Sequence, residues 1–357
     1  MKKTNHNSST LKDVAARAGV SLASASRVLS NSDYPVSEAK KKRVFAAARE
    51  LNYQPNIFAR LLKGNDYNAL GVIVPTLQNP FYNQVVQGIE SVASKSNYEI
   101  MILSSHRSIE QERNNIHSLL QNRVMALLII SIDTNSDCLE EYICCGGKVA
   151  LLEANFKLKN AIVTETDHVG AAQLAVEYLV SYGHRRIAFL SSPLTKMSRR
   201  SVMLGIREMM KEYHLPFSED DIFLAAEEGE ADNGLYEFEV GKSLADAFFP
   251  HLKKYTAIIA INDLTAFGIM QGLMQRQLSI PKDISVISLD NIIYSEMISP
   301  PLTTVALPSF NLGAATCRSL LNTLMYPNES CVELVFHFSG QLVERQSVAD
   351  LRSVLIE

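Results

Sequence analysis

Polar side chains with the chemistry of ligand binding follow the apolar segments in the long C-terminal part of this sequence. They are amides, carboxylates and aromatic rings: Asn79, Phe81, Tyr82, Glu153, Asn262, Asp263, Asp290 and Asn291. Carboxylates and amides can each serve two hydroxyl groups, and an aromatic face packs on the apolar face of a sugar ring. Taken singly, each has a structural interpretation, since Asp263 can cap a helix and Phe81 can belong to a core. Their recurrence at successive strand ends predicts a pocket for a polyhydroxyl ligand.

A short segment near the N-terminus carries side chains suited to reading DNA bases. Its outward face combines small and apolar side chains with one arginine: Leu22, Ala23, Ser24, Ser26 and Arg27. Arginine can bond to two acceptors of guanine in the major groove, and small residues let a helix approach base edges and thymine methyl groups. The alternative for Arg27 is a solvated side chain or one that binds a phosphate.

Motifs of catalysis and cofactor binding are missing from the sequence. It contains no G-x-S-x-G, H-E-x-x-H, G-x-x-x-x-G-K or G-x-G-x-x-G pattern. The 8 histidines and 5 cysteines show no metal-ligand spacing, and we expect Cys144-Cys145 to be a dipeptide of buried apolar thiols rather than a metal clamp. We therefore expect a protein that is not an enzyme and that uses no cofactor or metal.

Charge is divided unevenly along the chain. Residues 1–64 contain twelve Lys and Arg against four Asp and Glu, a formal charge of +8, so the rest of a chain of net charge -4 carries -12. A basic head accumulates near phosphate backbones and an acidic body does not. We expect the head to bind nucleic acid, although lysine-rich N-termini also occur as solvated tails. A head that served only for assembly would not need this charge together with an exposed Arg27.

Composition places the chain among ordinary globular proteins. Apolar residues make up 47% and charged residues 20%, and 357 residues suffice for about two to three domains. The first ten residues contain no apolar signal region, and no run of eighteen apolar residues occurs. The odd number of cysteines argues against a disulfide framework. These features favour a cytoplasmic protein without a membrane partner.

Hydrophobic periodicity predicts three helices in residues 11–54, after a flexible N-terminus of residues 1–10. The first helix ends at Gly19, Ser21 caps the second and Ser37 caps the third. The expected inward positions are Leu11, Val14, Ala15, Ala18, Ala25, Val28, Leu29, Val44, Ala47, Ala48 and Leu51. Two short helices joined by a tight glycine turn form a helix-turn-helix.

Residues 55–68 join the head to the body. The segment begins with Pro55 and Asn56, reaches Gly64 after about two helical turns, and is too short to be a stable helix alone in water. Its apolar side chains are too many for a simple linker: Ile57, Phe58, Leu61 and Leu62. Such a segment can fold on a partner and press an apolar wedge into a minor groove. The alternative is a linker whose hydrophobic residues rest on the next domain.

Residues 69–357 alternate strand-length apolar runs with helix-length segments, and the rhythm restarts after residue 160. This alternation predicts parallel sheets that are covered on both faces. The expected fold is a small all-α head followed by an α/β core of two doubly wound lobes, about 69–163 with a C-terminal return and about 164–292. Ligands of such sheets sit at the carboxyl ends of the strands, which predicts a cleft between the lobes.

Several segments of the head resemble the lactose-repressor (LacI-type) family of bacterial transcription regulators. They are LKDVAARAGVSLASASRVLSN, VSEAKKKRVFAAARELNYQPN and ARLLKG. The resemblance implies that Leu22, Ala23 and Arg27 occupy base-reading positions and that Leu62 wedges into the minor groove at the centre of the operator. With the neighbouring positions, the expected DNA-binding set is Ser21, Leu22, Ala23, Ser24, Arg27, Asn56, Ala59, Leu62 and Lys63. Many sugar repressors have a polar residue where this chain has Leu22 and Ala23, so the operator preference of a relative is not transferable.

The body resembles the effector-binding core of the same family, which is similar to periplasmic sugar-binding proteins. The matching segments are HRRIAFL, INDLTAFGIMQGL, IPKDISVISLDN and SPPLTTVALP. The resemblance implies effector contacts at Asn262 and Asp290. The family usually has an effector-gripping arginine where this chain has Val202, and Arg199 and Arg200 lie nearby, either as replacements or as solvated side chains. The expected effector-binding set is Asn79, Phe81, Tyr82, Glu153, Arg200, Asn262 and Asp290.

Together these observations predict a homodimeric, ligand-controlled transcription regulator, and more specifically a repressor of carbohydrate-utilisation genes. It would bind a near-palindromic DNA operator through two heads and a sugar or sugar phosphate in the cleft. The tail from Leu342 is too short for the three to four heptads of a tetramerising coiled coil. The alternatives are a regulator of the same fold that depends on a co-repressor protein or on no effector, a sugar-binding module whose head serves assembly, and a degenerate sugar enzyme.

Overall fold

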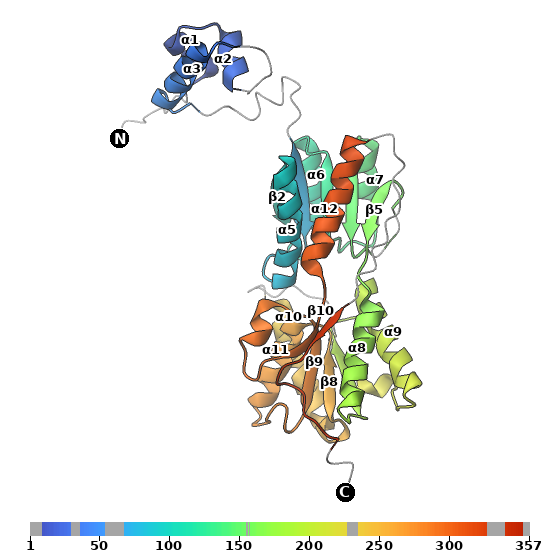
Figure 1. Cartoon of the computed structure of the whole chain (residues 1–357). Helices are drawn as coiled ribbons and strands as arrows, with labels where there is room; N and C mark the ends of the chain where they lie inside the picture. The colour runs from blue at the N-terminus through green and yellow to red at the C-terminus, as the bar shows by residue number, and fades with distance from the viewer. Residues whose placement is uncertain are drawn as a thin grey trace, which may run out of the picture. The chain divides into compact units, whose positions relative to one another are not determined.

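The computed structural model of the chain describes residues 9–29, 36–53, 68–154, 156, 158–226, 235–326 and 340–352. The chain divides into two compact units, Met1–Tyr67 and Asn68–Glu357. In the described ranges the first unit is helical and the second consists of two α/β lobes, so the predicted fold class is confirmed (Figure 1). Among the described helices, none combines the length and the hydrophobicity of a membrane span.

In the described part of the head, three short helices pack around a small core: α1 Leu11–Ala18, α2 Leu22–Leu29 and α3 Glu38–Glu50. Thr10 opens α1 with a capping box, in which the side chains of Thr10 and Asp13 each accept a hydrogen bond from the other's backbone N–H. Gly19 ends α1 in the left-handed conformation at φ 63°, as expected. Ser37 precedes α3 without a capping hydrogen bond. All inward positions predicted from the sequence are buried in this core or packed against it.

The first lobe of the body is built on a five-stranded parallel sheet in the order β2-β1-β3-β4-β5. Its strands are β1 Ala69–Val74, β2 Glu99–Ser104, β3 Ala126–Ile129, β4 Lys148–Leu152 and β5 Ala161–Thr164. Its helices are α5 Pro80–Ala93, η1 Ser94–Ser96, α6 Ile109–Gln121, α7 Asp137–Cys144 and α12 Ser309–Met325. Strands β1, β3 and β4 are buried along nearly their whole length, as expected of parallel strands with both faces covered.

The second lobe is built on a six-stranded sheet in the order β11-β10-β9-β8-β6-β7. Its strands are β6 Ile187–Ser191, β7 Ile222–Leu224, β8 Ala257–Ala260, β9 Ser285–Asp290, β10 Thr303–Ala306 and β11 Gln341–Val343. Its helical elements are α8 His168–Ser181, α9 Met197–Glu212, η2 Glu219–Asp221, α10 Tyr236–Phe248, η3 Phe249–Lys254, α11 Asp263–Met274 and η4 Ile293–Glu296. Two features differ from expectation: β11 pairs antiparallel to β10, and both strands extend this lobe beyond residue 292.

The chain passes from one lobe to the other after β5, after β10 and between α12 and β11. Figure 1 shows α12, the last helix of the described residues, beside α5 in the first lobe, whereas β9 and β10 lie in the second. The contact between α12 and α5 is close: a Cβ added at Gly313 would lie 2.1 Å from the carbonyl oxygen of Val85, and one at Gly88 would lie 2.0 Å from that of Phe310. The two helix backbones therefore touch, which anchors the returning chain to the first lobe.

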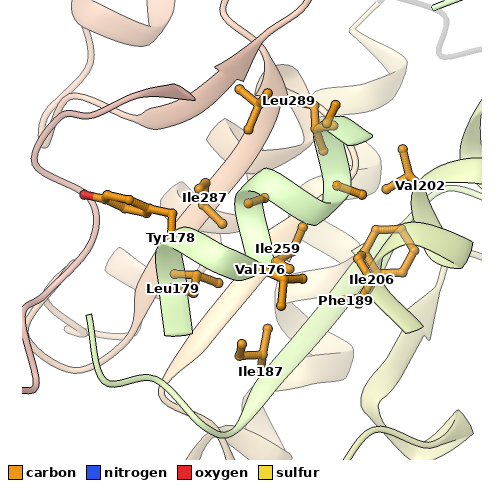
Figure 2. Close-up of a cluster of buried hydrophobic side chains, with 14 of the residues drawn as sticks. Val176, Tyr178, Leu179, Ile187, Phe189, Val202, Ile206, Ile259, Ile287 and Leu289 are labelled. Carbon is orange, nitrogen blue, oxygen red and sulfur yellow. The ribbon is translucent and has the colours of Figure 1, made fainter. Parts of the chain in front are cut away.

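A hydrophobic core fills the space between α8, α9 and one face of the second sheet (Figure 2). Val176, Leu179 and Ile206 from the helices meet Phe189 and Ile259 from the strands. At the carboxyl ends of the strands this core includes residues that also line a cavity: Val202, Ile261, Leu289 and Leu307. The floor of that cavity is thus part of the packed interior and is held rigidly.

Candidate functional site

A cavity of about 100 Å³ lies between the two lobes of the body, at the carboxyl ends of both sheets. Helix starts and residues at strand ends supply most of its walls. The lining residues are Asn79, Phe81, Tyr82, Arg107, Ile130, Ser131, Glu153, His168, Lys196, Ser198, Arg199, Val202, Glu237, Ile261, Asn262, Leu289, Asp290 and Leu307. Ligands of doubly wound folds bind at this place, because the carboxyl ends of parallel strands share one edge.

Asn79 builds part of the wall at the start of α5. It is the N-cap of this helix, and its Oδ1 accepts a hydrogen bond from the Phe81 N–H at 3.0 Å. Pro80 fits the first turn because it has no N–H, and a backbone N–H at this position would have no partner within the helix. Phe81 and Tyr82 then line the cavity with ring centroids 5.5 Å apart, edge to face. Burial raises the pKa of Tyr82 to about 12, so its hydroxyl group stays neutral.

Arg107 and Glu237 form an ion pair that joins the two lobes inside the cavity. Arg107 follows β2 in the left-handed conformation at φ 60°, and its guanidinium carbon lies 5.1 Å from the centroid of the Tyr236 ring. The amide of Asn79 donates to the same Glu237 carboxylate at 3.3 Å. Burial disfavours the charged form of Arg107, but the adjacent carboxylate outweighs it and raises the pKa of Arg107. The arginine therefore keeps its charge and links the lobes.

A second contact between the lobes pairs Glu153 with His168. Glu153 follows β4 at φ 56°, and His168 is the first residue of α8. His168 Nε2 and Glu153 Oε2 are 2.6 Å apart, and the Thr166 N–H donates to Glu153 Oε1 at 3.0 Å. Burial disfavours both charges, but mutual attraction and the hydrogen bonds prevail, so the pKa of Glu153 is lowered and the pKa of His168 is raised.

Asn262 and Asp290 contribute polar groups from the second lobe. Asn262 is the N-cap of α11 and its Oδ1 accepts from the Thr265 N–H at 2.9 Å, so its amide nitrogen is the group that can meet a ligand. Asp290 ends β9 at φ 115°, and no described residue forms a hydrogen bond or ion pair with its carboxyl group. Burial, assisted by the carboxylates of Asp263, Glu237 and Glu153, raises the pKa of Asp290 well above its ordinary value. Whether ionised or protonated, this carboxyl group can bond to ligand hydroxyls.

The structure corrects the expectation for Arg200, because Arg199 is the arginine that reaches the cavity. Helix α9 begins at Met197, and residues 199 and 202 share a face one turn apart, so Arg199 and Val202 both line the cavity. Arg199 is 8% exposed, and its Nη1 donates to a backbone carbonyl of the preceding loop at 2.7 Å. Arg200 is exposed on the helix and donates to two other carbonyl groups of that loop.

The other residues expected at the pocket all line the cavity: Asn79, Phe81, Tyr82, Glu153, Asn262 and Asp290. Sequence reasoning missed several polar lining residues: Arg107, Ser131, His168, Lys196, Ser198 and Glu237. Arg107 and Ser131 come shortly after apolar strand segments, a position that is itself a usable signal. Glu237 lies in the first turn of α10 and does not follow an apolar strand segment, so the sequence does not mark it as a pocket residue. Only the packing of α10 places it at the cavity.

In the head, α2 presents an outward face with the side chains expected to read DNA. The exposed ones are Leu22, Ala23 and Arg27. Ala25 and Val28 face the core on the other side of the helix. Ser21 precedes α2 and its Oγ accepts from the Ser24 N–H at 3.1 Å, while the two serine hydroxyls are 2.9 Å apart. Both serines therefore shape the start of the helix.

The expected hinge positions lie outside the described residues: Asn56, Ala59, Leu62 and Lys63. Within the ranges that the structure describes, no group of three or more His, Cys, Asp or Glu side chains could hold a metal ion. The expectation that Cys144 and Cys145 are buried is wrong: both are exposed at the end of α7.

Comparison with known proteins covers both units. Residues 10–56 match the family described as bacterial regulatory proteins, lacI family, and residues 67–334 match the periplasmic binding proteins and sugar binding domain of LacI family. The HTH-type transcriptional repressor PurR of Vibrio cholerae serotype O1 (strain M66-2) is 30% identical over 353 residues, which cover 96% of this chain and 98% of that protein. The ribose operon repressor of Escherichia coli (strain K12) is 32% identical over 321 residues, 89% of this chain and 94% of the repressor.

A crystal structure of the lac repressor dimer bound to operator and the anti-inducer ONPF has a TM-score of 0.79 and 27% identity, covering 96% of this chain and 99% of its own. These similar proteins are transcription repressors rather than enzymes. The match extends over the helix-turn-helix head and over both lobes around the cavity. This chain belongs to the LacI family of bacterial regulatory proteins.

Proposed function

We propose that this protein is a transcription repressor that binds operator DNA through its head, is controlled by a small effector in the interlobe cavity, and catalyses no reaction. One observation carries the proposal: a single chain joins an exposed helix with Arg27 to a polar cavity whose walls come from two lobes. A ligand that touches both lobes binds one arrangement of the lobes better than another. It therefore shifts the balance between two states, which is the physical basis of control at a distance.

The chemistry of the cavity supports a sugar or a sugar phosphate as the effector. Asp290 and Asn262 offer groups for adjacent hydroxyls, and Phe81 offers an aromatic ring. Arg199 adds a buried cation, the preferred partner of a phosphate. The name of the ribose operon repressor makes a pentose the first compound to test, and genes of carbohydrate utilisation are the proposed targets.

The protein is proposed to act in the bacterial cytoplasm as a homodimer on a near-palindromic operator, because the two-fold symmetry of a dimer is mirrored in its DNA site. The lac repressor dimer on its operator supports this arrangement. In each protomer, residues 11–54 would bind one half-site of the operator. Residues 55–68 of the two protomers would fold together in the central minor groove. Within that hinge, Leu62 is proposed as the wedge, with Asn56, Ala59 and Lys63 beside it.

A regulator that needs no effector is the second candidate. The ion pairs Arg107–Glu237 and Glu153–His168 favour it, because they join the lobes through side chains of the protein itself. Lobes held together in this way do not require a ligand, and a co-repressor protein would then supply the control.

A thermal-shift screen of sugars and sugar phosphates on the full chain, followed by operator titration with each hit, separates the two candidates. A bound effector raises the unfolding temperature by mass action and changes the operator Kd. An empty screen, or hits that leave the operator Kd unchanged, would favour the effector-independent regulator. Capture of genomic DNA fragments at low ionic strength supplies the operator, and failure to capture any duplex would overturn the DNA-binding proposal.

A further inference from the structure

Asp290 presents its carboxyl group to the cavity from an unusual backbone conformation. Its φ is 115° and that of Asn291 is 56°, in the half of conformational space that residues other than glycine rarely adopt. Such a conformation persists only when its surroundings hold it. The carboxyl group of Asp290 bonds to no described residue, so other contacts must hold this turn. One of them is the hydrogen bond that Arg345 Nη2 donates to Asn291 Oδ1 at 2.8 Å, and it leaves residues 288–290 to be held by other groups.

The buried carboxylate of Asp263 bonds to the chain on both sides of Asp290. Ser288, two residues before Asp290, donates from its Oγ to Asp263 Oδ1 at 2.5 Å. Ile292, two residues after Asp290, donates from its backbone N–H to Asp263 Oδ2 at 2.7 Å. One side chain thus fixes both ends of the segment 288–292, and the turn at Asp290 lies between the two fixed points.

Two further hydroxyl groups fix the Asp263 carboxylate itself. Ser295 Oγ donates to Oδ2 at 2.5 Å, and Thr304 Oγ1 donates to Oδ1 at 2.7 Å. Asp263 is 0% exposed, and its partners are three hydroxyl groups and one N–H, with no cation among them. A carboxylate in this setting is tolerable only because all of its bonds are made, so its position is tightly determined.

Asp263 itself does not line the cavity, whereas its neighbour Asn262 and the bracketed Asp290 do. We propose that Asp263 is the positioning residue of the effector pocket: it holds residues 288–292 in the left-handed turn that directs the Asp290 carboxyl group into the cavity. The inference rests on the proposed function, since it takes the cavity to be the effector site. It assigns a role in ligand recognition to a side chain that touches no ligand.

Asp263 also acts on Asp290 through its charge. Burial is the largest cause of the raised pKa of Asp290, and the carboxylate of Asp263 is the next. Asp263→Asn removes this charge and keeps the turn, so it should lower the pKa of Asp290. NMR titration of the Asp290 carboxyl carbon measures this pKa, which a purely structural role of Asp263 would leave unchanged.

Variants of the full chain separate positioning from general stability. Asp263→Ala removes all four hydrogen bonds. Asp263→Asn keeps the shape, because its amide oxygen can serve the Ile292 N–H while hydroxyl groups reverse and accept from its NH₂. Ser288→Ala breaks one bond of the bracket with a smaller change. Its matched control is Ser347→Ala, a serine of 0% exposure whose hydroxyl joins β9 and β10 at the ends away from the cavity.

Amide hydrogen exchange of residues 288–292 in the ligand-free protein is the direct test. We expect Asp263→Ala to accelerate exchange in this segment roughly tenfold or more, and Ser288→Ala to do so to a smaller extent. Asp263→Asn and Ser347→Ala should leave it near the wild-type rate. If Asp263→Ala fails to fold, Ser288→Ala against Ser347→Ala gives the same comparison. Equal exchange in the bracket variants and in the control would overturn the proposal.

Calorimetric titration with D-ribose as the probe tests the consequence for binding. We expect Asp290→Ala and Asp263→Ala each to weaken ribose binding roughly 10- to 100-fold. The double variant should lose no more than Asp290→Ala alone, because a positioning residue then has nothing left to position. Additive losses would contradict the positioning role. If the wild-type chain binds neither D-ribose nor any compound of the screen, the effector proposal fails, while the exchange data still decide whether Asp263 holds the turn.

Discussion

Arg199 and Arg200 are adjacent in the sequence but have different surroundings. Arg199 is buried at the cavity, whereas Arg200 is exposed on α9 and does not line the cavity. We expect Arg199→Met to weaken binding of a sugar hit from the screen roughly 10- to 100-fold, because a buried cation that can bond to the ligand is lost while the apolar stem is kept. Arg200→Met, the matched control, should leave the Kd nearly unchanged. Similar losses in the two variants would mean that this face of α9 does not select the ligand.

Arg27 is the single cationic side chain among the residues expected to read bases. We expect Arg27→Ala to weaken operator binding by about 1–3 kcal/mol and to relax the preference at one base pair. Arg17→Ala is the control: it removes the same charge from an exposed ion pair between α1 and α3, and it should affect binding to all sequences weakly and evenly. Competition titrations against operator and random duplexes measure both. An equal loss of affinity for the two duplexes after Arg27→Ala would argue for a phosphate contact instead of base reading.

At the scale of elements, the contact of α5 with α12 decides how the C-terminal part of the chain is held. We expect Gly313→Ala to lower the free energy of unfolding by about 1–3 kcal/mol. The reason is that the new Cβ meets a backbone carbonyl group that cannot move without shifting α5. Asn311→Ala, at an exposed position of the same helix, is the control and should change stability little. Urea unfolding followed by circular dichroism gives both values. A Gly313→Ala protein as stable as wild type would show that the two helices can separate at no cost.

Helix caps also belong to this scale, and they position the pocket. Asn79 and Asn262 each use a side-chain oxygen to start a helix, which leaves the amide nitrogen directed elsewhere. In Asn79 that nitrogen donates across the lobes to Glu237. The same residue type thus fixes the local backbone and supplies a polar group to the cavity.

At the scale of the whole molecule, the pair Glu153–His168 makes the attachment of the lobes depend on pH. The pKa of His168 is raised, so its pairing stabilises the fold below the ordinary value of 6.5 and this stabilisation is lost as pH rises through the raised pKa. The pKa of Glu153 is lowered, so its contribution is present above 4.5 and is lost as pH falls through the lowered pKa. The pair therefore stabilises the fold most between about pH 4.5 and pH 6.5, where both contributions are fully present.

We expect His168→Gln to unfold at a lower temperature than wild type in the mildly acidic range, with the difference shrinking toward alkaline pH. His251→Gln, an exposed histidine of η3, is the control and should follow wild type throughout. Thermal unfolding across this pH range measures the effect. A difference that stays constant with pH would mean that the charge of His168 has no part in joining the lobes.

The C-terminal tail bears on the assembly of the whole molecule. Ser347, Ala349 and Leu351 all bond to the second lobe, through Val286, Ser285 and Tyr182. The described part of the tail, up to Arg352, is therefore bound along this lobe. We expect light scattering at micromolar concentration to give the mass of a dimer. A stable tetramer would contradict this expectation.

Local patterns in the sequence were sufficient for the order of the elements and for the core of the head, because hydrophobic periodicity and capping residues act over a few neighbours. They also located the cavity through Glu153, Asn262 and Asp290, since parallel strands bring their carboxyl ends to one edge. Only the tertiary structure decided that Arg199 faces the cavity, that Arg107 meets Glu237, and that Asp263 brackets the turn at Asp290. Such contacts join residues far apart in the chain or depend on where a helix begins, and packing, which local patterns do not encode, determines both.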